Sequence, residues 1–208
     1  MHIALIVLDL GGGGAERSVL GLAEGLIKRG YRVDIILLRT GIQYREEVPK
    51  DTRLFIVENR PNESTENSAE ILAPITRLRA PSRPFDWVRM ANALNWDPLC
   101  LPGPSLVRQA RAIAAYMDVE KPNCVLPSLS RPTIATLLAC HFLTEPPPII
   151  PTIRNFVQYH RYRTKRRYRH LAGHVTHFVG VSQGVSNSLT ATIGVPSCLL
   201  YTSPSPRD

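Results

Sequence analysis

The sequence predicts an α/β domain in which helices cover both faces of a mostly parallel sheet. The chain opens with an apolar run at residues 3–8, which is typical of a strand buried on both faces. A glycine run follows, then an amphipathic helix pattern over residues 15–29, and then a second apolar run at 33–38. This strand–helix–strand start predicts a doubly wound, Rossmann-like sheet with right-handed crossovers.

The rest of the chain continues the alternation. Strands are expected at 54–57, 124–126, 149–153 and 175–181, and helices at 85–94, 105–117, 132–141, 161–169 and 183–192. Between residues 60 and 84 the periodicity fails and polar residues with proline dominate, which predicts a mobile surface loop. Trp87 and Trp96 are expected to pack the helix at 85–94 against the domain.

Composition favours a globular, cytoplasmic protein. The 208 residues, 44% of them hydrophobic and 20% charged, are enough for one sizeable core. No apolar run approaches the roughly 20 residues of a membrane span, and no basic segment precedes the first strand, so neither a membrane helix nor a signal peptide is expected. The four cysteines are widely spaced and fit neither a metal site nor a disulfide framework. The net charge of +8 favours an anionic partner, which could be nucleic acid, an anionic lipid surface or a phosphorylated substrate.

The first candidate binding site is the run Gly-Gly-Gly-Gly-Ala-Glu-Arg at residues 11–17. Glycines let the backbone turn tightly and approach a ligand closely. The free N–H groups of a helix N-terminus and the helix dipole both favour an anion there. The run therefore predicts a phosphate-bearing ligand held by the backbone of Gly12, Gly13 and Gly14, and a close-packed turn without a ligand is the alternative.

The glycine run fits neither of two common phosphate motifs. No Gly-Lys-Ser/Thr follows, so it is not a P-loop. A dinucleotide fingerprint would need a small residue at Glu16 or Arg17, and the second strand ends without an acid for a ribose hydroxyl. Arg39 could face a 2′-phosphate instead, which leaves an NADP-dependent Rossmann reductase as an alternative, although a Tyr-x-x-x-Lys catalytic pair is missing.

Polar residues follow several of the expected strands. Because ligands bind at the carboxyl ends of parallel strands, these residues should converge on one crevice with the glycine run. They are Ser128, Ser130, Arg131, Arg154, Asn155, Ser182 and Gln183, joined by Glu16 and Arg17 from the first helix. Helix capping is the alternative role for each of them.

The helix expected at 161–169 is strongly basic. Its cationic residues are Arg161, Arg163, Lys165, Arg166, Arg167 and Arg169. Such a helix could rest on an anionic membrane surface, and a solvated basic face is the alternative. A nucleic-acid-binding module is a third interpretation, but the aromatic platform or recognition helix of such modules is missing.

Three stretches, in this order, resemble the family-four retaining glycosyltransferases. The glycine run, followed by Leu-Ala-Glu-Gly-Leu at 22–26 and Arg-Gly-Tyr-Arg-Val-Asp at 29–34, resembles the start of that family. Lys-Pro-Asn-Cys-Val at 121–125 resembles the family's Lys/Arg-Pro-Asp-Val-Val stretch at the start of a strand. Val-Gly-Val-Ser-Gln-Gly-Val at 179–185 resembles its strand followed by Val-Ser-Glu/Gln-Gly-Val. The resemblance covers the chain nearly to Pro196.

The resemblance implies the N-terminal, acceptor-side half of a GT-B enzyme, over residues 1–197. Such enzymes transfer a sugar with retention from a nucleotide-sugar, here a UDP- or GDP-sugar, to an acceptor hydroxyl. They use no metal or other cofactor. Gly12 to Gly14 would contact the donor phosphates or sugar, and the polar residues at the strand ends would bind a glycan or lipid-linked acceptor. A role in polysaccharide or glycolipid synthesis, peripheral on the inner face of the membrane and without a nucleic-acid partner, is the expectation.

The sequence departs from the family in three places. Residues 127–131 offer no histidine where many relatives have one after the fourth strand. Glu16 and Glu24 have the spacing of the family's Glu-x7-Glu motif without its context, so the catalytic residues are expected in a C-terminal donor domain that is missing here. Residues 198–208 resemble a translated sequencing adaptor, which predicts a truncated chain with a non-native tail; a genuine Pro/Ser-rich tail is the alternative. The fragment alone is expected to be inactive.

Overall fold

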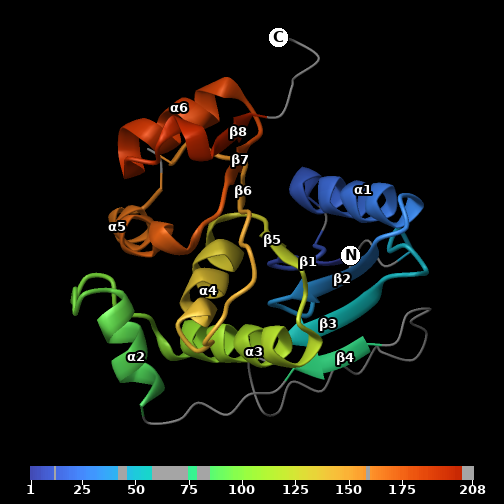
Figure 1. Cartoon of the computed structure of the whole chain (residues 1–208), viewed down its shortest axis with the longest axis horizontal. Coiled ribbons are helices and arrows are strands. Elements are labelled where there is room, and N and C mark those ends of the chain that lie inside the picture. Colours follow the sequence, from blue (N-terminus) through green and yellow to red (C-terminus); the bar gives the residue numbers. More distant parts are fainter. Residues whose placement is uncertain (12, 42–45, 58–74, 79–84, 158–159, 203–208) are drawn as a thin grey trace.

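The computed structural model describes residues 1–11, 13–41, 46–57, 75–78, 85–157 and 160–202. Its strands pair in parallel, in a five-stranded sheet of order β4-β3-β2-β1-β5 and a three-stranded sheet of order β6-β7-β8 (Figure 1). The strands are β1 (His2–Val7), β2 (Arg32–Leu37), β3 (Arg53–Val57), β4 (Ile75–Leu78), β5 (Cys124–Pro127), β6 (Thr152–Ile153), β7 (Phe178–Gly180) and β8 (Leu200–Thr202). Parallel bridges join Val125 to Ile149 and Ser128 to Thr152, so β6 lies beside β5 and the two sheets form one surface.

Helices cover both faces of this surface, which confirms the predicted doubly wound α/β fold. They are α1 (Gly14–Lys28), α2 (Asp86–Ala93), α3 (Pro104–Glu120), α4 (Ser130–Cys140), α5 (Tyr162–Leu171) and α6 (Gln183–Ile193), with 3-10 turns η2 (Ala172–His174) and η3 (Ser197–Leu199). Within the described ranges, α1 alone packs on one face, and residues of α3, α4, α5 and α6 share a single apolar core on the other. None of the described helices combines the length and apolar character needed to cross a bilayer.

Successive side chains of β1 point to opposite faces of the sheet, so they pack alternately into the core under α1 and the core under α3 and α4. Ile3, Leu5 and Val7 pack with α1, whereas Ala4 and Ile6 belong to the core under α3 and α4. Fully burying one such aliphatic side chain stabilises the fold by about 1.5–3 kcal/mol. A one-residue slip in register would exchange the two faces, so the apolar run determines the register of the central strand.

The order of the strands reverses beside β1, which places the candidate site. β2, β3 and β4 extend from one side of β1, and β5 to β8 extend from the other (Figure 1). A crevice forms at the carboxyl ends of the strands at such a switch point, because the loops on its two sides run to opposite faces. The turns that follow β1, β5 and β6 therefore border the same crevice.

Two predictions about the middle of the chain are wrong. Ile75–Leu78, within the loop expected at 60–84, forms β4 and pairs with β3. The other residues of that loop lie outside the described residues. Trp87 and Trp96 do not pack α2 down, since their exposed fractions are 42% and 61%. Helical spacing explains the difference, because Met90 and Leu94 lie one turn apart on the buried side of α2 and fill the core instead.

The strands near the C-terminus differ from expectation. Those expected at 149–153 and 175–181 are shorter, with regular pairing only in β6 and β7. Leu200–Thr202, in the segment expected to lie outside the fold, pairs with Phe178–Gly180 as β8. The adaptor origin of residues 198–208 stays a prediction.

Candidate functional site

The glycine run makes the turn from β1 into α1. Gly13 is the extended N-cap residue, and no side chain caps the first turn of α1, which begins at Gly14. Before it, the N–H of Gly11 donates to Oδ1 of Asp9 at 3.1 Å, which holds the start of the turn. An uncapped first turn offers backbone N–H groups to an anion. Gly12 lies outside the described residues.

The carboxylate of Glu16 lies at this turn, within range of the charge of Arg154. Glu16 folds back over Gly13 so closely that a Cβ at residue 13 would overlap its Oε2 atom. Arg154 lies just after β6 and is half-buried. Burial lowers the pKa of its guanidinium, and the negative charge of Glu16 acts to raise it. Nε of Arg154 is buried and has no hydrogen-bond partner among the described residues. Because an unsatisfied buried donor is costly, Arg154 is the best-placed residue to receive an anionic ligand. Arg17 is exposed and lies 3.6 Å from a Glu47 carboxylate oxygen instead.

The turn after β5 places a histidine beside the predicted Ser130. Ser128 is buried, and its N–H donates to the carbonyl of Ile6 at 2.8 Å. Leu129 has a φ of 71°, a left-handed conformation that is rare for a bulky residue, and it turns the chain into α4. Oγ of Ser130 then lies 3.3 Å from Nε2 and 3.5 Å from Nδ1 of His160.

His160 is the functional candidate that sequence reasoning missed. It lies in the segment before α5, whereas the turn after β5 contains no histidine. Its ring is half-buried, and burial, followed by the charge of Lys165, lowers its pKa, so it is neutral at pH 7 and has one donor and one acceptor nitrogen. No spacing rule links residues 130 and 160, and only the packing of α5 on α4 brings them together.

Arg131 is held at the edge of the crevice. Its Nε donates to Oε1 of Gln109 and its Nη2 to Oγ of Ser105, both at 3.0 Å, so it ties α4 to α3. Burial lowers its pKa, and the positive charges of Arg39 and Arg167 lower it further. This side of the crevice is therefore cationic.

The residues after β7 are mainly engaged with α6. Oγ of Ser182 accepts the N–H of Val185 at 3.4 Å and caps the helix, and Gln183 donates to Oδ1 of Asn187 at 2.9 Å. Asn155 is exposed. The structure thus groups Gly13, Glu16 and Arg154, and separately Ser130 and His160, while the acceptor role expected of Ser182, Gln183 and Asn155 stays a prediction.

The basic residues of α5 and the segment before it divide into two groups. Arg161 and Arg163 are exposed, and Lys165 is half-buried. Arg166 and Arg167 instead hold the segment that follows α2. Nε of Arg167 donates to the carbonyl of Cys100 at 2.8 Å, and its Nη2 donates to the carbonyl of Leu101 at 2.9 Å. The structure therefore gives Arg166 and Arg167 a packing role, and a membrane role for any of the five stays a prediction.

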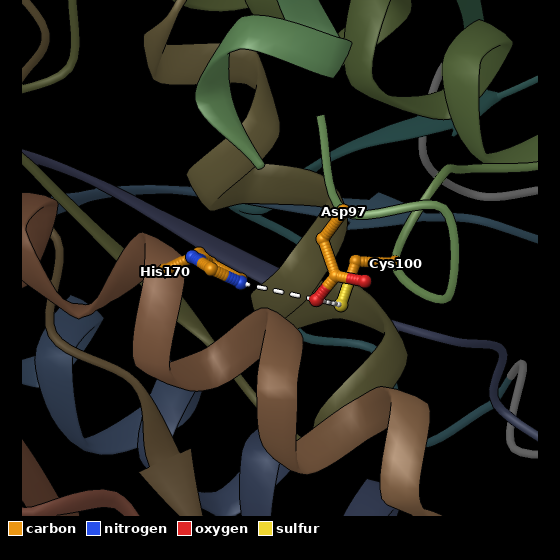
Figure 2. Close-up of side chains that lie close together, drawn as sticks. All are labelled: Asp97, Cys100 and His170. Carbon is orange, nitrogen blue, oxygen red and sulfur yellow. Dashed lines mark hydrogen bonds and ion pairs between the residues drawn. The ribbon is translucent and has the colours of Figure 1, made fainter. Parts of the chain in front are cut away.

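Figure 2 shows Asp97, Cys100 and His170 close together between this segment and α5. Oδ2 of Asp97 accepts a hydrogen bond from Sγ of Cys100 at 3.3 Å, lies 3.4 Å from Nε2 of His170, and accepts one from Nε of Arg166 at 2.5 Å. Burial acts to raise the pKa of Asp97, but the bonds from Cys100 and Arg166, the Leu99 N–H and His170 outweigh it and hold the value at about 2. We call these three side chains, together with Arg166, the Asp97 cluster.

The Asp97 cluster has the spacing of a metal site but not its electrostatics. One potential ligand atom from each of Asp97, Cys100 and His170 lies within 4.8 Å of the others, as a transition metal would require. However, Arg166 already supplies a positive charge to the carboxylate. Burial, followed by Asp97 itself, raises the pKa of the Cys100 thiol and opposes the thiolate that a metal needs. The cluster is best explained as a structural contact that holds the segment after α2 against α5.

The fold and the crevice together define an α/β protein with a glycine turn and cationic side chains at the carboxyl ends of its strands. Residues 12–205 match the model of Glycosyltransferase Family 4. The chain belongs to this family.

Solved structures share the fold at low sequence identity. HepE of Anabaena in complex with UDP has a TM-score of 0.60 at 13% identity, over 97% of this chain and 43% of that one. Sucrose-phosphate synthase of Thermosynechococcus elongatus has a TM-score of 0.60 at 14% identity, over 98% and 48%. MurG of Acinetobacter baumannii has a TM-score of 0.52 at 15% identity, over 98% and 46%. The chain thus spans less than half the length of these proteins and has the α/β fold of GT-B glycosyltransferases. A search of curated proteins gave no significant match.

Proposed function

We propose that this chain forms the acceptor-side part of a glycosyltransferase that moves a sugar from a nucleotide-sugar to an acceptor hydroxyl with retention. The donor is a UDP- or GDP-sugar, and the product belongs to polysaccharide or glycolipid synthesis. Family membership supports the sugar-transfer chemistry and disfavours the NADP-dependent reductase. The reaction needs no metal, because the developing charge on the leaving diphosphate is met by backbone N–H groups and a guanidinium.

The observation that supports this function most directly is the buried Nε of Arg154, which has no hydrogen-bond partner among the described residues and lies within range of the charge of Glu16 at the start of α1. A diphosphate oxygen can accept from Arg154 and from the N–H groups of the first helical turn at once. Glu16 would repel the phosphate if it stayed in place. Its carboxylate therefore turns toward the sugar and accepts a hydrogen bond from a sugar hydroxyl, while Arg154 keeps the phosphate.

The acceptor occupies the part of the crevice next to β5. Neutral His160, in contact with Ser130, can accept a hydrogen bond from an acceptor hydroxyl with one nitrogen and donate with the other. Arg131 is fixed by Gln109 and Ser105, so it acts through its charge on this side of the site. Ser128, Asn155, Ser182 and Gln183 complete the wall at the ends of β5, β6 and β7.

Ligand titration followed by NMR tests the proposal on the 208-residue chain. UDP, GDP, inorganic pyrophosphate and NADP are added in turn, with Arg154→Ala and Arg154→Lys beside the original and Arg29→Ala as a control on the exposed end of α1. We expect UDP or GDP to shift the amides of residues 13–16, and Arg154→Ala to weaken binding ~10-fold or more through loss of a charge-assisted bond. Arg154→Lys should recover part of the loss.

Two results would contradict the proposal. Equal binding by Arg154→Ala and Arg29→Ala would remove Arg154 from the site, and a preference for NADP over both nucleoside diphosphates would favour the reductase. Sugar transfer is then measured separately, and turnover by residues 1–197 alone would contradict the expectation that the fragment is inactive.

A further inference from the structure

A second pocket lies at the amino-terminal edge of the sheet, where α3 and α4 lead into the strands that follow them. Its volume is about 340 Å³, within the range of about 300–1,000 Å³ that is usual for small-molecule sites. One wall is the end of α3 with the turn before β5, and the other is the segment after α4. Gly13, Ser130 and Arg154 follow strands and so lie at the opposite edge. The pocket is therefore separate from the candidate sugar-transfer site.

Half of the residues that line this pocket are apolar. Met117 and Pro122 are buried, and Leu143 and Pro147 are half-buried. A ligand with an apolar part would remove more of this surface from water, which is favourable in proportion to the apolar area covered. The lining therefore favours a ligand that is not entirely polar.

The remaining lining residues bring charges of both signs to the pocket. Asp118, Lys121 and Glu145 are exposed there, beside Thr144. Asp118 and Lys121 are three positions apart at the end of a helix, a spacing at which opposite charges often pair. Within the described part of the chain, however, none of the three charged side chains has an ion-pair or hydrogen-bond partner. Two carboxylates and one ammonium group are thus open to a ligand.

The helix ends at the pocket add to its attraction for a positive group. The carboxyl end of a helix carries a partial negative charge, which a basic side chain in the last turn usually offsets. Neither α3 nor α4 has a basic residue in its last turn. Asp118 lies in the last turn of α3, and α4 ends at Cys140, shortly before Leu143. An ammonium group near Asp118 and Glu145 would meet both the carboxylates and the helix dipoles.

The backbone of Lys121 indicates a use for its side chain. Lys121 ends α3 with a φ of 45° and a ψ of 57°, a left-handed conformation that costs free energy for any residue with a Cβ. Glycine is the usual residue at such a helix end, because it adopts this conformation without strain. A strained lysine at the rim of a pocket points to a function for its ammonium group.

We propose that this pocket binds a free amino acid with an apolar side chain. Asp118 and Glu145 receive its ammonium group, Lys121 receives its carboxylate, and its side chain packs on the apolar lining. A zwitterion uses both signs of charge, whereas a simple amine would leave Lys121 unused and a simple carboxylate would be repelled by the two acids. The proposal goes beyond sugar transfer and does not depend on it.

Four ligands of related shape test this assignment on the 208-residue chain. L-phenylalanine and L-leucine are titrated while the amide shifts of residues 117–121 and 143–145 are followed by NMR. Phenethylamine lacks the carboxylate of phenylalanine, and hydrocinnamate lacks its ammonium group. We expect both amino acids to shift these amides and each truncated ligand to bind ~5-fold more weakly than phenylalanine, the loss of one exposed charge pair. The amides of residues 13–16 should not move.

Two variants separate recognition from folding. Lys121→Gly should weaken phenylalanine binding ~5-fold and leave phenethylamine binding unchanged. It should not lower the midpoint of thermal unfolding, because glycine adopts the left-handed backbone without strain. Glu145→Gln should weaken the binding of phenylalanine and phenethylamine alike, whereas Glu24→Gln, which removes an exposed carboxylate from α1, should change neither.

Four outcomes would overturn the proposal. The first is the absence of shifts at the pocket with both amino acids. The second is phenethylamine or hydrocinnamate binding as tightly as phenylalanine, which would remove the zwitterion from the argument. The third is an equal effect of Glu145→Gln and Glu24→Gln. The fourth is a response confined to residues 13–16, which would assign the ligand to the crevice.

Discussion

Replacing Asp34 by asparagine should destabilise the fold severely, because one fully buried carboxylate organises the amino-terminal edge of the sheet. Its Oδ2 accepts from the hydroxyl of Tyr116 at 2.6 Å and lies 2.8 Å from Nε2 of His2. Nε and Nη2 of Arg53 donate to its two oxygens at 2.9 and 2.5 Å. Asparagine has nearly the same shape but no charge, and its NH2 group would face these donors.

The magnitude follows from which partners are left unsatisfied. Arg53 keeps Glu120, whose oxygens lie 3.2 and 2.6 Å away, so its charge is not orphaned. The buried hydroxyl of Tyr116 loses its acceptor, which costs about 1–3 kcal/mol. Loss of the bidentate pair with Arg53 brings the expected destabilisation to about 3–5 kcal/mol. Tyr116→Phe removes the donor as well as the bond and keeps the packing on Phe55, so it should cost only ~1 kcal/mol.

The same carboxylate makes stability depend on pH. Burial acts to raise the pKa of Asp34, but bonds from Arg53, Tyr116 and His2 hold it below its ordinary value of 3.8. The folded state therefore binds its proton less readily than the unfolded state. The contribution is fully present above about pH 4 and is lost as the pH falls through the lowered value.

Urea unfolding of the original and both variants, followed from pH 7 to pH 2.5, measures both effects. Asp34→Asn should lose the part of the acid decline that this carboxylate causes, and Tyr116→Phe should keep most of it. A loss of less than about 1 kcal/mol at pH 7 for Asp34→Asn would refute the reasoning, because it would mean that the network contributes no more than an exposed pair.

Three further substitutions test local features by thermal unfolding. Gly180→Ala should cost about 1–3 kcal/mol, because the new Cβ would overlap Oγ of Ser186 and approach its backbone nitrogen at 3.2 Å; Ser186→Ala in the same chain should restore part of the loss, and full tolerance of the single change would contradict the packing of α6 on β7. Ser182→Ala should cost about 0.5–2 kcal/mol through loss of the α6 cap, whereas Ser182→Gly should cost less, and the reverse order would disprove the capping role. Gly194→Ala should cost about 1–2 kcal/mol, because residue 194 ends α6 with a φ of 83°, and an unchanged midpoint would show that the helix end can rearrange.

The hydrophobic pattern alone predicted the order of strands and helices, because a strand that is buried on both faces of the sheet must be apolar along its whole length. β1 shows this most clearly, since every residue of His2–Val7 is buried and neighbours alternate between the faces. The glycine run also predicted the turn into α1. β4 was missed because the surrounding sequence has no apolar period, so its pairing with β3 depends on tertiary contact that no local window contains.

The sequence predicted that the glycine turn and Arg154 lie at the strand ends, but it did not predict which side chains lie together, and their ligand-binding roles stay predictions. Arg154 and Glu16 are 138 positions apart, and they come within range of each other's charge because β1 and β6 end at the same edge of the sheet. Ser182 was predicted for ligand binding and is used as a helix cap, because a polar residue after a strand suits either role. The exposure of Trp96 could not be predicted, since tryptophan is normally counted as core and its left-handed backbone has no signal in the sequence.

Helix α5 connects the candidate site with the segment that follows α2. Just before the helix, His160 contacts Ser130 in the crevice, and on the helix Tyr168 is fully buried with its ring stacked near that of His160, 6.1 Å between centroids. The opposite side of α5 carries Arg166, which binds Asp97 and so holds the segment that presents Trp96. Asp97→Asn separates the two contacts, because it should loosen the segment around Trp96, seen as a change in tryptophan emission, while leaving the UDP-induced shifts at residues 13–16 unchanged. Loss of both together would show that the two sides of α5 are not independent.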